Sequence, residues 1–170
     1  MMRKLLVLLV SSLLLVSCLS VTSDGFVQET TIDGASLAEV TVVPQGGTND
    51  TSCYIVYVKN LTDGPISVDW GGCSISYLGK TYFMVVERQY GKTFETGVST
   101  EIPAGTLDAF TVYSSGQLRI GSNTYEIVKI PTAESSVTIS IEKGDVSTKY
   151  NFNITRQQYQ QSLVQKGIYY

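Results

Sequence analysis

The residues of this chain with the most chemical potential are its three cysteines, Cys18, Cys53 and Cys73. A thiol can be acylated, oxidised to a disulfide or used as a nucleophile once it is deprotonated. The chain contains no histidine, so it lacks the usual general base and the commonest transition-metal ligand. We therefore expect the cysteines to be modified or cross-linked, and we predict no catalytic site, metal site or cofactor.

The acidic side chains are the other group able to do chemistry. Two carboxylates facing each other in a cleft would suit a glycosidase, but the 15 acidic residues are scattered and no pair stands out. Solvated turns and strand edges account for them, so an enzyme is not predicted, and a carboxylate hydrolase remains an alternative. Without residues 1–17 the chain keeps ten basic and 15 acidic residues, a net charge of −5, which argues against nucleic-acid binding.

Residues 1–17 have the form of an export signal. Arg3 and Lys4 precede a twelve-residue apolar run at positions 5–16. A helix that spans a bilayer needs about 20 apolar residues, whereas a secretory signal uses a shorter run of this kind. We therefore predict that residues 1–17 direct export and are then removed.

The run ends in Leu15-Val16-Ser17-Cys18, which resembles the lipobox of bacterial lipoproteins. The resemblance implies that Cys18 carries a lipid anchor inserted in a membrane and that residues 18–25 are its tether. It also implies outer-membrane delivery in preference to the inner membrane, because Leu19 stands where an Asp would retain the protein. An ordinary signal peptide cut near Ser17 or after Ser20 remains the alternative.

The body of the chain reads as a series of short strands. Alternating apolar and β-branched residues are separated by Gly, Pro, Asn and Asp, and no helical pattern lies between them. This pattern predicts an all-β domain at 26–154, an antiparallel β-sandwich. The expected strands are 26–32, 37–43, 53–60, 66–70, 74–78, 81–87, 109–113, 117–120, 125–129, 137–142 and 147–154.

The segment 53–73 suggests a hairpin whose arms are 53–60 and 66–70. Gly64 would take the left-handed position of a three-residue loop, which places Cys53 opposite Cys73. We therefore predict a Cys53–Cys73 disulfide, which an exported protein is free to form. Two separately buried thiols are the alternative if Gly71-Gly72 kinks the strand. The same register predicts one shared buried face made of Tyr54, Val56, Val58, Ile66, Val68 and Trp70.

A long polar connection at 88–106 is the candidate for recognition, since long loops on sandwiches often bind partners. Its proposed contact residues are Arg88, Gln89, Tyr90, Lys92 and Phe94.

The last residues, 155–170, change character. Thr155 and Gln158 match a capping box, which predicts one short helix at 156–166; a frayed Gln-rich tail is the alternative.

Two motifs suggest a family. The segment N-L-T-D-G-P-I-S-V-D-W at 60–70 and the later I-P-A-G at 102–105 resemble small immunoglobulin-like lipoproteins of bacteria and their prophages. The similarity covers roughly residues 52–111 and implies an immunoglobulin-like β-sandwich, with no activity carried over.

These features together favour a non-enzymatic binding or structural module held at the cell envelope by its lipid. The expected partner is an envelope protein or a polysaccharide. The alternative is an envelope inhibitor or phage-exclusion factor that blocks an enzyme or receptor through a loop.

Overall fold

The computed structural model describes residues 26–32, 35–46, 50–88, 93–120, 125–131 and 135–154. The predicted signal, tether, C-terminal helix and loop residues 89–92 lie outside these ranges. The elements in chain order are β1 (Phe26–Ile32), β2 (Ala35–Gln45), β3 (Asp50–Thr51), β4 (Cys53–Asn60), β5 (Ile66–Asp69), the 3₁₀ turn η1 (Trp70–Gly72), β6 (Ser74–Tyr77), β7 (Lys80–Arg88), β8 (Thr93–Glu95), β9 (Ser99–Ile102), β10 (Leu107–Ser114), β11 (Leu118–Ile120), β12 (Tyr125–Ile127), β13 (Ile130–Pro131), β14 (Ser135–Lys143) and β15 (Val146–Ile154).

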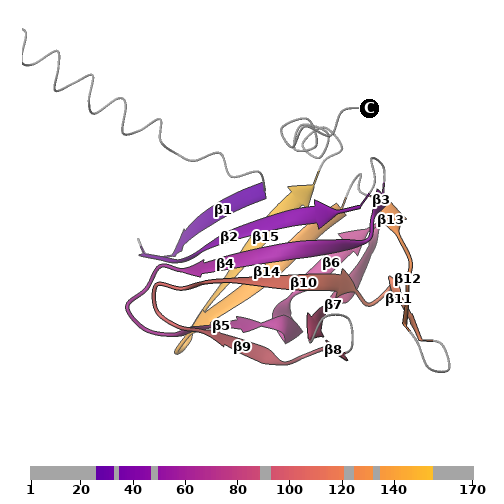
Figure 1. Ribbon diagram of the computed structural model, residues 1–170. Helices are drawn as coiled ribbons and strands as arrows, with labels where there is room; N and C mark the ends of the chain where they lie inside the picture. Colours follow the sequence, from indigo (N-terminus) through magenta and orange to yellow (C-terminus); the bar gives the residue numbers. More distant parts are fainter. Residues whose placement is uncertain are drawn as a thin grey trace, which may run out of the picture.

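The strands form two layers that are joined through β7 (Figure 1). The first layer has the order β1-β2-β4-β10, and the second contains β14 with β15 on one edge and β5 and β6 on the other. The start of β7 pairs with β6 up to Phe83, while its continuation from Met84 pairs with β10. All pairings are antiparallel, so the predicted all-β, antiparallel sandwich is confirmed.

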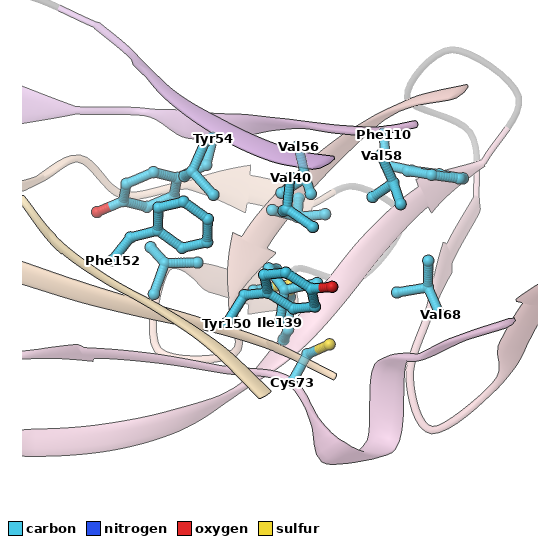
Figure 2. Close-up of a cluster of buried hydrophobic side chains, with 14 of the residues drawn as sticks. Val40, Tyr54, Val56, Val58, Val68, Cys73, Phe110, Ile139, Tyr150 and Phe152 are labelled. Atoms are coloured by element: carbon cyan, nitrogen blue, oxygen red, sulfur yellow. The ribbon is translucent and has the colours of Figure 1, made fainter. Parts of the chain in front are cut away.

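The core forms where the inner faces of the two layers meet. In β4 and β15 every second side chain is buried, which is the pattern of strands with one face on a core and one toward water. Figure 2 shows Tyr54, Val56 and Val58 of the first layer pointing toward side chains of the second layer such as Tyr150 and Ile139. The six residues predicted to be buried are all at most 1% exposed.

The predicted hairpin between 53–60 and 66–70 is wrong. β4 pairs with β2 and β10, while β5 pairs with β14 and β9, so the turn at 61–65 carries the chain from one layer to the other. The apolar faces of β4 and β5 are opposed across the core, whereas the hairpin would have set them side by side in one sheet. Alternation of apolar residues specifies which face is buried and is the same in both arrangements.

The predicted Cys53–Cys73 disulfide is also wrong, because both thiols are free. Cys53 starts β4, Cys73 directly precedes β6, and these two strands do not pair. The alternative of two separately buried thiols holds for Cys73, whereas Cys53 is separate but half-buried. The kink falls at η1, where a Cβ on Gly72 would lie 2.7 Å from Asp69 Oδ2 and 3.0 Å from Ser140 Cβ. Glycine is therefore required at this close approach.

Cys73 has a structural task at this kink. η1 separates β5 from β6, and both pair with the same edge of β14 on either side of Ser140. The Ser140 N–H donates to Cys73 Sγ at 3.2 Å, and the thiol is 3.1 Å from the carbonyl oxygen of Asp69, to which it donates. At the kink no residue of β5 or β6 is paired with Ser140, and a buried N–H without a partner is energetically costly. The Cys73 sulfur therefore accepts the hydrogen bond that a backbone carbonyl of a continuous strand would have accepted.

Asn60 fixes the crossing between the layers. Its buried amide nitrogen donates to the Gly64 carbonyl at 2.8 Å and to the Ile102 carbonyl at 3.0 Å. Its amide oxygen accepts from the Thr62 N–H at 2.8 Å, which closes the turn as an Asx-turn. The side chain thus ties the end of β4 to both the turn and β9 of the other layer.

Replacing Asn60 should therefore be costly. We expect Asn60→Ala to lower the free energy of unfolding by about 2–4 kcal/mol, because buried carbonyls lose their donor. Urea denaturation measures this difference. The matched control is Asn153→Ala, an exposed asparagine on β15, which should change stability by no more than about 0.5 kcal/mol. Equal effects of the two substitutions would show that Asn60 does not hold the crossing.

Candidate binding surfaces

The predicted binding loop is a hairpin at its base. β7 continues into β8, with Glu87 opposite Phe94 and Arg88 opposite Thr93. Of the five predicted contact residues, Arg88 and Phe94 are described, whereas Gln89, Tyr90 and Lys92 fall outside the described ranges. The two described residues show what the base of the loop does.

Arg88 joins three strands. Its guanidinium contacts Glu95 Oε2 at 3.2 Å and donates to Thr100 Oγ1 at 2.6 Å. Thr100 Oγ1 also accepts from the indole N–H of the buried Trp70 at 2.9 Å. The N–H groups of the guanidinium donate to residues of β8 and β9, so Arg88 closes the side of the sandwich between the layers. Its side chain is half-buried, which suits this structural role better than binding a ligand.

Phe94 belongs to an aromatic group on the outer side of the first layer. Its ring meets Tyr113 edge-on, with centroids 5.5 Å apart, and Tyr125 with centroids 4.6 Å apart. Tyr113 is buried and donates to Glu87 Oε2 at 2.8 Å; burial and the Glu87 contact raise its pKa. In this part of the surface, Tyr125 and Ile127 of β12 are exposed by 48% and 40% and offer apolar surface to a partner.

A second surface lies on the outer face of the second layer. Pairing between β15, β14, β6 and β7 aligns Asn153, Ser136, Ser76 and Thr81 in one row across four strands. None of the four is buried and none is charged. A hydrogen bond of 2.8 Å joins the hydroxyls of Ser76 and Thr81.

The adjacent row has the same character. It consists of Asn151, Thr138, Ser74 and Phe83, again with no charge and no buried member. Thr138 Oγ1 donates to Asn151 Oδ1 at 2.9 Å. Phe83 is 58% exposed and is the only large apolar side chain of the eight. We call these eight residues the neutral rows.

The neutral rows are not among the sites predicted from the sequence. Their signal was present, since Ser74 and Ser76, Ser136 and Thr138, and Asn151 and Asn153 each alternate with apolar residues. Alternation alone cannot say which strands are neighbours, however, and the rows exist only in the observed register.

The remaining expectations can be placed briefly. Cys18 lies outside the described residues. Within the described ranges, no three or more Cys, Asp or Glu side chains are grouped to hold a metal ion. The same ranges contain no helix with the length and apolar character to cross a bilayer.

No protein-family model, curated protein or solved structure matches the chain. The resemblance to immunoglobulin-like lipoproteins therefore stays a prediction.

The two described thiols should differ in reactivity. Cys53 is half-buried, whereas Cys73 is 2% exposed and burial raises its pKa from 9.0 to about 12. Because the thiolate is the reactive form, at pH 8 we expect a maleimide to modify Cys73 in the folded protein at least about tenfold more slowly than Cys53.

The same reagent tests the absence of the bridge. In denaturant without a reductant, both residues should be labelled completely, as read by peptide mass spectrometry. If Cys53 and Cys73 were labelled only after reduction, the two thiols would be joined in a disulfide, contrary to this expectation.

Proposed function

We propose that this protein is a lipid-anchored binding module of the cell envelope, exported by residues 1–17 and attached to a membrane through Cys18. The observation that carries the proposal is the order of its parts. Positive charge, a short apolar run and a lipobox-like tetrapeptide are followed, only eight residues after the start of the proposed tether, by the first strand at Phe26. Two or three acyl chains on Cys18 would be enough for durable attachment.

The shape of the domain suits attachment at its first strand. β1 and β15 lie side by side, so both described ends of the domain, Phe26 and Ile154, are on the same side of the molecule (Figure 1). The crossing turn at 61–65 lies at the far left of Figure 1, away from both ends. A tether at Phe26 therefore leaves the broad outer faces of the sandwich free to meet a partner.

Binding fits this chain better than catalysis does. The absence of histidine removes the usual proton-transfer group. In the neutral rows, two hydrogen bonds between neighbouring strands join Ser76 to Thr81 and Thr138 to Asn151. Rigid strand-borne side chains of this kind favour recognition, because their positions are fixed before a partner arrives. The proposed role is to hold an envelope component near the membrane, with Leu19 favouring the outer membrane.

The anchor is tested by Cys18→Ser in cells that express the full chain. We expect the unaltered protein to stay in the membrane fraction through a high-salt wash and to be released by detergent. Cys18→Ser should move at least about tenfold more protein into the soluble fraction, since the acyl chains supply the attachment. Quantitative immunoblotting of the fractions measures the ratio.

The matched control is Cys53→Ser, which removes a described thiol and should leave membrane retention unchanged. Mass spectrometry of the mature N-terminal peptide should show Cys18 as its first residue with acyl chains attached. Equal retention of Cys18→Ser and the unaltered protein would contradict the proposal.

A further inference from the structure

We propose that the neutral rows bind an uncharged polysaccharide, laid across β15, β14, β6 and β7. This inference rests on the proposed function, because it names the partner class of the binding module. It starts from the composition of one sheet face and from the register that assembles it.

The absence of charge on this face selects among partners. The chain carries 27 charged residues, yet none of the eight members of the neutral rows is charged. Charged residues flank the rows on the same strands, with Lys149 opposite Ser140 next to the second row and Lys80 opposite Tyr77 next to the first. The eight side chains themselves offer no ion-pair partner to nucleic acid, an acidic polymer or a basic protein, whereas a neutral ligand needs none.

The polar groups match the hydroxyls of a sugar chain. Hydroxyls and amides both donate and accept, as sugar hydroxyls do. Thr138 donates to the side-chain oxygen of Asn151, and the two N–H donors of the same Asn151 amide are not used in this bond. The bond between Ser76 and Thr81 likewise fixes one hydroxyl pair and leaves their remaining lone pairs for a ligand.

The backbone holds these groups at a regular spacing. Directly opposite residues of paired antiparallel strands have Cβ atoms about 5 Å apart, so four strands present four polar positions in a line. This period is comparable with the repeat of a sugar ring along a polysaccharide. A repeating ligand can therefore make similar contacts at successive strands.

Phe83 supplies the apolar part of the surface. Its side chain is 58% exposed to water on the same face as Ser74 and Thr138. Exposing an apolar ring to water is unfavourable. The face of an aromatic ring is electron-rich, and the C–H groups on one side of a sugar ring are polarised positively. Stacking a sugar on Phe83 would cover this exposed ring while neighbouring hydroxyls and amides hold the sugar's oxygens.

The test is a pull-down of the full-length protein, purified in detergent, on insoluble polysaccharides. The neutral matrices are a β-glucan, chitin, a mannan and cross-linked dextran, and the anionic matrix is cross-linked polygalacturonate. We expect retention on at least one neutral matrix, competition by soluble oligosaccharides of the same sugar, and no dependence on salt between low and physiological concentration.

Two substitutions place the binding on the neutral rows. Phe83→Ala and Asn151→Ala should each reduce the bound fraction at least about tenfold, because they remove the stacking ring at one end of the second row and the amide at its other end. Leu107→Ala is the matched control, since Leu107 is 60% exposed but starts β10 in the first layer. It should bind like the unaltered protein, and urea denaturation should show that all three variants fold.

The contrary outcomes are distinct. Failure to bind all four neutral matrices, or unchanged binding by both Phe83→Ala and Asn151→Ala, overturns the inference. Salt-sensitive binding to polygalacturonate alone also overturns it, because charge would then direct recognition. Each of these results leaves the anchor intact, whereas loss of the anchor is seen only in the fractionation of Cys18→Ser.

Discussion

The fold depends on burying two apolar strand faces against each other, which requires the chain to change layers between β4 and β5. Neither face is stable in water alone, because each exposes a row of valines, isoleucines and aromatic rings. The crossing turn makes the two meet, and Asn60 holds it by bonding to Gly64 and Ile102 at once. The hydrogen bonds of this one amide therefore hold the crossing that places β4 and β5 in opposite layers.

The kink at η1 has a comparable effect on the second layer. It divides one long strand into β5 and β6, so that β9 pairs with the first part and β7 with the second. β7 can then continue into the first layer and connect the two sheets. Two residues stabilise the kink. Cys73 accepts the hydrogen bond of the Ser140 N–H, and Gly72 has no side chain to clash with Asp69 and Ser140.

Much of the fold was predictable because its evidence is local. The strand class, the β14–β15 turn with Gly144 in the left-handed region, and the burial of Trp70 all follow from residue type and alternation. Strand partners did not follow, since β4 meets residues more than forty positions away in β10. The predicted disulfide failed for this reason: it assumed that neighbours in sequence were neighbours in the sheet.

The candidate sites divide in the same way. A lipobox-like tetrapeptide is contiguous, so Cys18 can be singled out from sequence alone. The loop residues Arg88 and Phe94 were chosen for their position in a polar segment, but their contacts are with Glu95, Thr100 and Tyr113 of the domain itself. The neutral rows combine four strands, and only the register shows that their uncharged residues form one surface.

The central claim is that β4 and β5 lie in opposite layers, and nuclear Overhauser contacts between backbone protons in solution test it directly. Tyr57 of β4 should show cross-strand contacts to Thr41 of β2 and to Ala109 of β10. Contacts from Tyr57 to Asp69 of β5, with none to Ala109, would mean that the two segments form a hairpin and that the sandwich described here is incorrect.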